Sequence, residues 1–389
     1  MTSAPCPLVL EDALSLQAVG PIPVNEPKLD GNERAYLLDC IDTAWISSEG
    51  PYIERFEAAM AERVNRRFGI GVANGSAALE IAVAALKLSP GDEVILPSFT
   101  IISCATAVLR NGATPVVVDC DPTTLNSTAD HYAAAITPRT KALMVVHIYG
   151  LPVDMDPILA LAEKHGLAVI EDAAEMHGQT YKGRPCGSFG TLSTFSFYPN
   201  KLVTAGEGGM VMTNDPVLAE NCRSLRNLCF NPKQRFVHDE LGWNYRLTNM
   251  QAALGLAQVE KLDQTVARKR VIGATYTDLL SSISGVQLPL TRTDYAEGLY
   301  WVYSLILDDN LEMDAKAAMA SLAAHRIGTR PFFWPMHLQP VFQKMDLFKG
   351  VSCPVAERIA KRGFYVPSGV GIKEVQMRRV AAVIRQVLR

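Results

Sequence analysis

One lysine stands where its amine could act as a nucleophile. Lys201 follows the apolar, aromatic segment Phe195-Ser196-Phe197-Tyr198-Pro199-Asn200 and precedes the turn Gly206-Glu207-Gly208-Gly209. Most lysines are solvated surface charges, and the residues alone leave that interpretation open. If the flanking segment turns Lys201 inward, burial lowers the pKa of its amine and makes it a good nucleophile. The glycines would let the backbone approach a ligand closely.

Three carboxylates follow the apolar segment Ala168-Val169-Ile170. They are Glu171, Asp172 and Glu175, and carboxylates at the end of a strand are costly to bury without a partner. They could cap the next helix, bind magnesium as in a nucleotide-hydrolysing enzyme, or hold the cation of a protonated ring nitrogen. This segment alone does not decide between these roles.

A third candidate is an anion-binding turn at Asn74-Gly75-Ser76-Ala77. It lies between a predicted strand, Gly69–Ala73, and a predicted helix, Ser76–Lys87, which Ser76 would cap. Free backbone N–H groups and the positive end of a helix dipole suit a phosphate. An ordinary helix cap is the other interpretation. A dinucleotide loop is not favoured, because Asn74 replaces the third glycine of the GxGxxG pattern.

Together, these three groups are the parts that pyridoxal phosphate needs. A lysine amine can hold the aldehyde, a carboxylate can keep the pyridine nitrogen protonated, and a helix N-terminus can anchor the phosphate. Each motif is weak by itself, but their order in one stretch of chain favours a pyridoxal-phosphate enzyme.

The elements that must position these groups alternate between strands and helices from about residue 68 to 214. Apolar segments rich in Val, Ile and Phe predict seven buried strands: Gly69–Ala73, Glu93–Pro97, Thr114–Asp119, Lys141–Ile148, Leu167–Asp172, Leu192–Phe197 and Gly209–Thr213. Helices are predicted at Ser76–Lys87, Ile102–Arg110 and Asp154–His165. This alternation predicts an α/β layer with a mainly parallel sheet, in which ligands bind beyond the carboxyl ends of the strands.

The pattern changes after Asn249. Residues Asn249–Tyr276 predict one long amphipathic helix, and a smaller α+β unit follows with a helix at Asp314–His325 and another at Lys373–Leu388. We place the boundary near residue 262, which gives a large cofactor-binding domain at 1–262 and a small C-terminal domain at 263–389.

Composition excludes several classes of protein. The chain has 389 residues and a net charge of −3 from 37 basic and 40 acidic residues, which argues against binding of nucleic acid by charge. No apolar run reaches the length of a membrane-spanning helix, about 18 residues or more. The first residues, MTSAPCPLVLEDALSL, lack the pattern of a signal peptide.

The cysteine and histidine spacings favour neither disulfides nor a metal site. None of the eight cysteines forms a CxxC pair, and no HxxxH or HExxH pair occurs. We expect buried thiols in a reducing compartment, the cytoplasm, and no metal.

The sequence resembles the sugar aminotransferases of the DegT/DnrJ/EryC1/StrS family, and within it the perosamine-type members. The likeness extends from Pro27 to Gly369. Its sharpest motifs are Trp45-Ile46-Ser47-Ser48, Asn74–Leu79, Thr137-Pro138-Arg139-Thr140-Lys141, His147-Ile148-Tyr149-Gly150, Glu171–Glu175, Phe195–Lys201, Gly206–Gly209 and Gly242-Trp243-Asn244-Tyr245-Arg246-Leu247-Thr248-Asn249.

The resemblance implies the fold-type I architecture and a homodimer with shared active sites. It implies Lys201 as the Schiff-base and proton-transfer residue and Asp172 as the partner of the pyridine nitrogen. Glu175 would lie near the cofactor's hydroxyl, where perosamine-type members also have Glu. Asn244 would reach the phosphate of the neighbouring subunit's cofactor.

The same resemblance implies how the phosphate is held and what covers the ring. Ser76 and Ala77 would bind phosphate through their backbone N–H groups, and Ser196 through its hydroxyl. Ile101 replaces the aromatic residue that often stacks on the ring, a departure from the family pattern.

We expect transfer of an amino group from L-glutamate to a keto sugar. The perosamine likeness favours a nucleotide-linked 4-keto-6-deoxyhexose, and an unlinked 8-oxo-octulosonate, aminated for lipopolysaccharide, is the alternative. A cofactor-binding regulator without turnover is disfavoured by the complete set of Lys201, Asp172 and Ser196. Candidate substrate contacts are Arg330, Trp334, His337 and Trp45. A core or interface residue is the other interpretation of the two tryptophans.

Overall fold

The computed structural model describes residues 20–388. Residues 1–16, where we predicted no signal peptide, and Cys6 lie outside these residues. Within them, every cysteine is a free thiol and is buried. None of the helices between residues 20 and 388 is both long and apolar enough to cross a bilayer.

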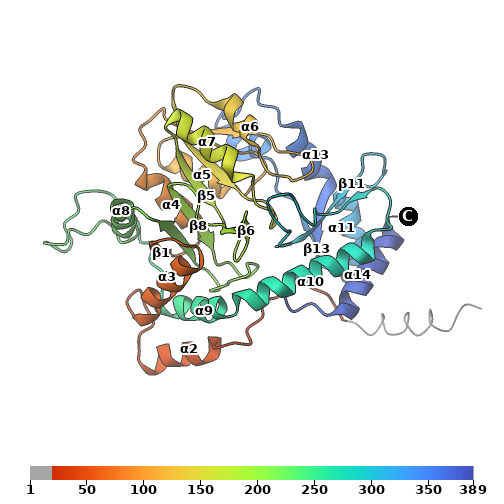
Figure 1. Ribbon diagram of the computed structural model, residues 1–389, viewed down its shortest axis with the longest axis horizontal. Coiled ribbons are helices and arrows are strands. Elements are labelled where there is room, and N and C mark those ends of the chain that lie inside the picture. The colour runs from red at the N-terminus through yellow and green to blue at the C-terminus, as the bar shows by residue number, and fades with distance from the viewer. Residues whose placement is uncertain (1–19, 389) are drawn as a thin grey trace, which may run out of the picture.

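The centre of the molecule is a seven-stranded sheet in the order β1-β9-β8-β5-β4-β2-β3 (Figure 1). Its strands are β1 (Phe68–Val72), β2 (Glu93–Pro97), β3 (Thr114–Val118), β4 (Thr140–Val146), β5 (Ala168–Asp172), β8 (Leu192–Ser196) and β9 (Gly209–Thr213). Strands β3, β2, β4, β5 and β8 pair in parallel, and β9 is antiparallel to both β8 and β1. The predicted mainly parallel sheet of seven strands is therefore confirmed, with each strand's ends within two residues of the predicted ones.

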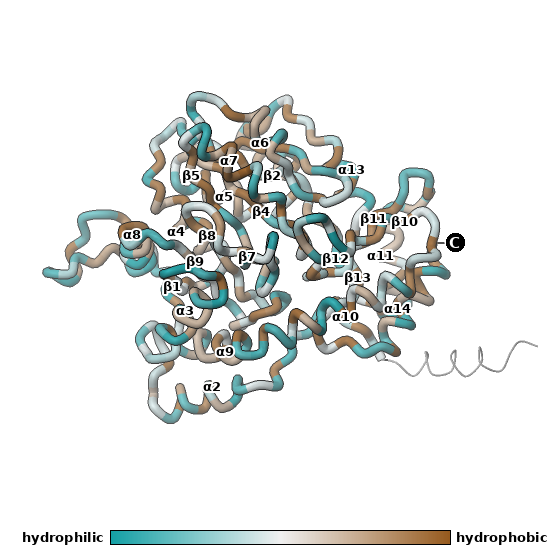
Figure 2. Tube along the Cα trace, in the orientation of Figure 1, coloured by the Kyte–Doolittle hydropathy of each residue, from teal (hydrophilic) through white to brown (hydrophobic). Residues whose placement is uncertain are grey.

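Helices pack against this sheet and bury their apolar side chains there. They are α4 (Gly75–Ala85), α5 (Ser103–Arg110), α6 (Ala129–Ala135), α7 (Met155–His165) and α8 (Pro216–Arg226), with α2 (Glu33–Asp42) and α3 (Pro51–Arg63) preceding the first strand. Figure 2 shows the hydrophobic residues gathered in the strands and the more hydrophilic ones along the outer helices and loops.

A second, antiparallel sheet is built from the C-terminal part of the chain, in the order β10-β11-β13-β12. Its strands are β10 (Val286–Gln287), β11 (Tyr303–Leu307), β12 (Arg330–Pro331) and β13 (Gly363–Val366), and β6 (Thr180–Tyr181) with β7 (Arg184–Pro185) forms a separate hairpin. The other C-terminal elements are α11 (Ala315–Ala324), η1 (Met336–Leu338), α12 (Pro340–Lys344), α13 (Pro354–Arg362) and α14 (Glu374–Val387). The predicted smaller α+β unit is confirmed.

The prediction of one long helix over Asn249–Tyr276 is wrong. Two helices occupy this stretch, α9 (Asn249–Glu260) and α10 (Leu262–Leu280), because Lys261 leaves the helical conformation with φ −107° and ψ 6°. The side chain of Lys261 forms an ion pair with Asp30 at this break. A one-residue interruption leaves the apolar periodicity nearly intact, so the sequence pattern does not reveal it. The domain boundary that we placed near residue 262 coincides with this break and stays a prediction.

The prediction that Ser76 caps α4 is also wrong. Asn74 is the N-cap, and its side-chain oxygen accepts a hydrogen bond from the backbone N–H of Ala77 at 2.9 Å. Asn and Ser are equally good caps, so residue type alone could not choose between them. Ser76 is the second residue of the helix instead.

Candidate active site

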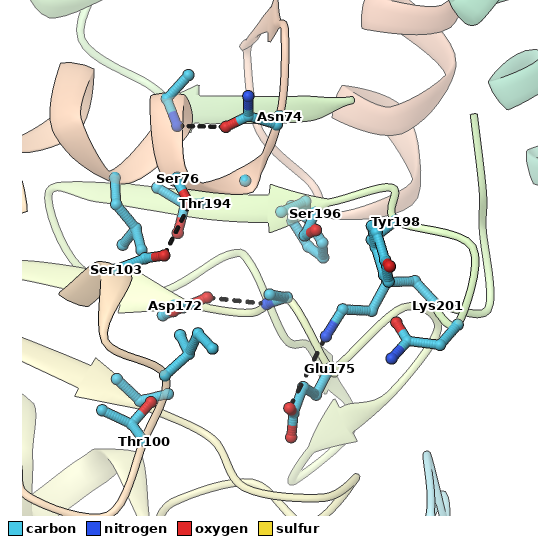
Figure 3. Close-up of a pocket in the computed structure, with 18 of the residues that line it drawn as sticks. Asn74, Ser76, Thr100, Ser103, Asp172, Glu175, Thr194, Ser196, Tyr198 and Lys201 are labelled. Atoms are coloured by element: carbon cyan, nitrogen blue, oxygen red, sulfur yellow. Dashed lines mark hydrogen bonds and ion pairs between the residues drawn. The ribbon is translucent and has the colours of Figure 1, made fainter. Parts of the chain in front are cut away.

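A cavity of about 660 Å³ opens at one edge of the central sheet. Residues that follow the ends of β1, β2, β4, β5 and β8 line it, and those five ends meet at the same edge because the strands run in the same direction. The lining from these segments includes Asn74, Gly75, Ser76, Ala77, Thr100, Ile101, His147, Asp172, Glu175, Ser196 and Lys201. Figure 3 shows several of these side chains pointing toward one another across the cavity.

Lys201 reaches the cavity with its amine withdrawn from water. The side chain is only 10% exposed, and its Nζ lies 3.8 Å from Oε1 of Glu175 (Figure 3). Burial lowers the pKa of the Lys201 amine, an effect that the nearby carboxylates of Glu175 and Asp172 oppose. The flanking segment therefore turns the lysine inward, and the surface-charge interpretation does not hold.

Glu175 is the buried partner of this amine. Its Oε2 accepts a hydrogen bond from the backbone N–H of Tyr149 at 2.6 Å, which fixes the carboxylate from the other side. Burial raises the pKa of Glu175, and the charge of Lys201 opposes that rise. Because burial disfavours both charges, this pair can exchange one proton at little cost.

Asp172 ends β5 on the floor of the cavity. It is 3% exposed, and its Oδ1 accepts a hydrogen bond from the N–H of Ala174 at 3.1 Å. The thiol of Cys104 lies 3.6 Å from Oδ2 and donates to it. Burial raises the pKa of Asp172, an effect that the N–H of Ala174 and the charge of Lys201 oppose. A cation placed beside it would reverse that effect.

The first turn of α4 and the end of β8 form a narrow cup. A Cβ atom on Gly75 would lie 2.7 Å from Cβ of Ser196, so only glycine allows the two segments to approach this closely. The first residues of a helix have N–H groups with no acceptor inside the helix, and Gly75 and Ser76, which begin α4, both line the cavity. The N–H of Ala77 is already donated to Asn74.

Several predicted site residues are not in the cavity lining. Asn244 is exposed, and its Oδ1 accepts from Arg246 Nε at 2.9 Å. It lies at the base of the loop after α8, which extends away from the body of the molecule (Figure 1). Trp45 and Trp334 are 49% and 44% exposed. Arg330 is exposed on β12, next to Pro331, which does line the cavity.

His337 lies behind the cavity rather than in it. Its Nδ1 is hydrogen-bonded to Oγ of Ser98 at 2.8 Å, and its Nε2 lies 3.0 Å from Oε1 of Glu357. Ser98 follows β2 and Glu357 is in α13, so this chain of contacts ties α13 to the central sheet. Ser98 is fully buried and His337 is 4% exposed, which leaves a substrate no access to these two groups.

One further cluster has the spacing of a metal site: His147, Glu171 and Cys186. Both oxygens of Glu171 accept backbone N–H groups, from Gly187 at 2.6 Å and from Phe189 at 2.8 Å. Nδ1 of His147 accepts the N–H of Val153 at 3.0 Å, so its Nε2 carries the proton and donates to Glu171. Both nitrogens of His147 and both oxygens of Glu171 are thus engaged in hydrogen bonds that hold loops together.

The sequence patterns did not identify the aromatic and basic residues that complete the cavity. Trp301, Phe333 and Tyr365 come from the C-terminal part of the chain, and Arg110 from α5. Nothing in the sequence places residue 301 beside residue 201, because their proximity depends on how the second sheet meets the first.

Comparison with known proteins places the chain in a family. The model of the DegT/DnrJ/EryC1/StrS aminotransferase family matches residues 27–385. The chain is 44% identical to a GDP-perosamine synthase of Caulobacter vibrioides, over 94% of this chain and 98% of that protein. It is 40% identical to the enzyme of the same name from Escherichia coli O157:H7, over 92% and 95% of the two chains.

A similar protein is also found among solved structures, and it has the same fold. The crystal structure of DesV from S. venezuelae, in complex with a ketimine intermediate, superimposes with a TM-score of 0.87 at 34% identity, covering 95% of this chain and 100% of that one. The chain belongs to the DegT/DnrJ/EryC1/StrS family and is a pyridoxal-phosphate-dependent aminotransferase.

Proposed function

We propose that this enzyme transfers an amino group from L-glutamate to a keto sugar, and that the sugar is a nucleotide-linked 4-keto-6-deoxyhexose. The observation that carries this proposal is the similarity, at 39–44% identity over at least 92% of the chain, to three GDP-perosamine synthases. A cavity of about 660 Å³ is also large enough for a cofactor and a substrate side by side.

The residues of the cavity fit pyridoxal phosphate. The cup between Gly75 and Ser196, which a Cβ would fill, combines helix N–H groups with a hydroxyl and suits a phosphate. Asp172 is a buried carboxylate whose raised pKa calls for a cationic partner, as a pyridinium nitrogen is. Lys201 provides a desolvated amine in the same cavity, 3.8 Å from Glu175 Oε1.

Each residue then has a role that follows from its surroundings. When bound, pyridoxal phosphate accepts electrons from the substrate's Cα–H bond and carries the amino group from one substrate to the other. Asp172 holds the ring nitrogen, Ser76 and Ser196 hold the phosphate, and Ala77 can join them only if its N–H leaves Asn74. Lys201 attaches the cofactor and moves a proton at Nζ, and Glu175 Oε1 can hold that proton while the amine is neutral.

Two spectroscopic half-reactions test this function. The protein, supplied with cofactor, is mixed with L-glutamate while its visible absorbance is recorded, and a keto sugar is then added. We expect the absorbance to fall with glutamate and return with a GDP-4-keto-6-deoxyhexose, with an amino sugar as product. Return only with an 8-oxo-octulosonate would contradict the nucleotide-linked substrate, and no change with glutamate would contradict the donor.

We also propose a homodimer in which Asn244 completes the partner's site. Asn244 is exposed and lies outside the cavity of its own chain. Apolar side chains on and after α2, among them Leu38, Ile41 and Ile46, are exposed as well, as an unpaired interface would leave them.

Hybrid dimers test the sharing of sites. Inactive Lys201→Ala and Asn244→Ala proteins are mixed, dissociated and reassociated. If Asn244 acts across the interface, a hybrid dimer has one site with both defects and one with neither, so activity returns to up to half that of the wild-type protein per dimer. Mixtures that stay inactive, or a monomeric mass in sedimentation, would contradict this proposal.

A further inference from the structure

Trp301 contacts Lys201 in two places. Its indole Nε1 donates a hydrogen bond to the carbonyl oxygen of Asn200 at 2.9 Å, in the peptide unit that leads into Lys201. The centre of its ring lies 3.8 Å from Nζ of Lys201. One side chain thus holds both the backbone at the base of the lysine and the amine at its tip.

We propose that Trp301 is a positioning residue for Lys201, whose indole N–H fixes the turn that carries the lysine and whose ring face holds the free amine. This inference rests on the proposed function of Lys201, and it adds a residue that the sequence patterns did not connect with the site.

The turn that carries Lys201 depends on few other contacts. The backbone N–H of Lys201 donates to the carbonyl oxygen of Tyr198 at 2.9 Å, and Asn25 Nδ2 donates to that of Pro199 at 3.2 Å. Of these three hydrogen bonds, only the one that Trp301 donates is accepted by the carbonyl oxygen of Asn200, the residue next to the lysine. Loss of the indole N–H would therefore leave a partly buried carbonyl without its partner and loosen the turn.

The ring face explains where an ammonium can rest in this cavity. Burial disfavours the charged amine, and the groups that face it are the carboxylates of Glu175 and Asp172 and the ring of Trp301. The face of an indole attracts a cation, more strongly when water is excluded. Trp301 is itself 5% exposed, so its attraction for the amine is not screened by solvent.

Trp301 also forms part of the wall behind the lysine. Trp301, Lys201 and Asn200 line both the main cavity and a much smaller one of about 20 Å³. That smaller space is sufficient for about one water molecule. The indole and the lysine thus lie together where the two spaces adjoin.

The backbone of Trp301 packs closely against the turn that follows β4. A Cβ atom on Gly150, which has φ +95°, would lie 2.6 Å from the backbone nitrogen of Trp301. Gly150 follows Tyr149, whose N–H binds Glu175. The positions of Trp301 and Glu175, on two sides of the lysine, are thus set by the same turn.

Two variants and a matched control test the inference. Trp301→Phe keeps a ring face and removes the N–H, and Trp301→Leu removes both. Because misplacement of a reacting group by about 1 Å can cost a hundredfold in rate, we expect kcat to fall about tenfold in the first and about a hundredfold in the second, with KM values within about twofold. Leu322→Ala, in the buried core of α11 and far from the cavity lining, should lower Tm without changing kcat.

A second readout reports on the amine itself and does not depend on turnover. Full-length protein freed of cofactor is labelled with acetic anhydride over a range of pH, and labelling of Lys201 is measured by mass spectrometry. Removal of a group that stabilises the ammonium should move the midpoint to lower pH, further in Trp301→Leu than in Trp301→Phe. A midpoint that stays or rises in both variants, or a kcat within twofold of wild type, would overturn the inference.

Failure of the inference can be separated from failure of the proposed function. Borohydride reduction of the wild-type protein fixes the cofactor to the lysine that holds it. Attachment to a lysine other than Lys201 would overturn the proposed role of that residue and, with it, the role of Trp301. Attachment to Lys201, combined with Trp301 variants that behave as wild type, would overturn only the inference about Trp301.

Discussion

Nζ of Lys201 lies 3.8 Å from Oε1 of Glu175, in a place where burial disfavours the charge on both groups. The pKa of the amine is lowered and that of the carboxyl is raised. The two groups therefore tend toward a neutral pair, which is the state in which an amine can attack or accept a proton. This relationship gives the first prediction.

Glu175→Gln should move the acid limb of the kcat/KM profile to lower pH. The Glu175 carboxylate raises the pKa of Lys201 against the effect of burial, so its removal lets that pKa fall further and keeps the amine neutral in more acidic solution. The profile is measured from pH 5 to 9 beside Glu260→Gln, a change at an exposed carboxylate bound to Asn32 and Tyr36. An acid limb that moves upward would contradict the pairing.

Asp172→Asn should have opposite effects on activity and on stability. Loss of the negative charge beside the ring nitrogen should reduce kcat/KM about a hundredfold or more. The folded-state pKa of Asp172 is raised, so without cofactor its ionisation costs stability once the pH exceeds the usual carboxyl range.

The neutral Asn removes that cost and can still accept the N–H of Ala174. We therefore expect a higher Tm than wild type at pH 7 for the cofactor-free variant, and no such gain at pH 4, where the wild-type carboxyl is protonated as well. Calorimetry at the two pH values measures this difference. An equal change at both would show that the charge is not the cause.

Gly75→Ala should weaken cofactor binding. The added Cβ would lie 2.7 Å from Cβ of Ser196 and 2.9 Å from its Oγ, so the cup must widen. We expect the Kd for pyridoxal phosphate to rise about tenfold or more, as loss of one or two charge-assisted hydrogen bonds would cause. Gly371→Ala, where no atom lies within 4 Å of the added Cβ, is the control and should bind as wild type.

Asn74→Ala should lower the stability of the cofactor-free protein by about 1 kcal/mol, because α4 loses its N-cap. Asp314→Ala removes the equivalent bond, to the N–H of Ala317 at the start of α11, and should cost about the same. Only the change at Asn74 should also alter cofactor binding, since Asn74 lines the cavity and occupies the N–H of Ala77, and Asp314 does neither. Equal cofactor affinity in both variants would contradict the placement of the cup.

The parts of the fold that sequence predicted are those with strong local signals. The strand that ends at Asp172 begins with the apolar run Ala168-Val169-Ile170, a pattern typical of a buried parallel strand. Gly166 ends α7 in the left-handed conformation with φ +63°, as a glycine at that position predicts. The positions of Lys201, Asp172 and Glu175 in one cavity then follow from the order of the strands.

The remaining features depend on contacts between distant segments. The cap of α4 was misassigned because Asn74 and Ser76 are both good capping residues. The break at Lys261 interrupts the helix without changing its apolar pattern. Trp301 is 100 residues from Lys201, and only the packing of the second sheet against the first brings its ring to the amine. His337 was considered a substrate contact, but its partners Ser98 and Glu357 lie behind the cavity.

The most direct measurement is the site of covalent attachment. The protein is loaded with pyridoxal phosphate, reduced with borohydride and digested, and the modified peptide is identified by mass spectrometry. We predict modification at Lys201 alone in the wild-type protein and none in Lys201→Ala, which should also lose transamination with glutamate. Modification of another lysine, or substantial transamination by Lys201→Ala, would contradict the role of Lys201 and the arrangement built around it.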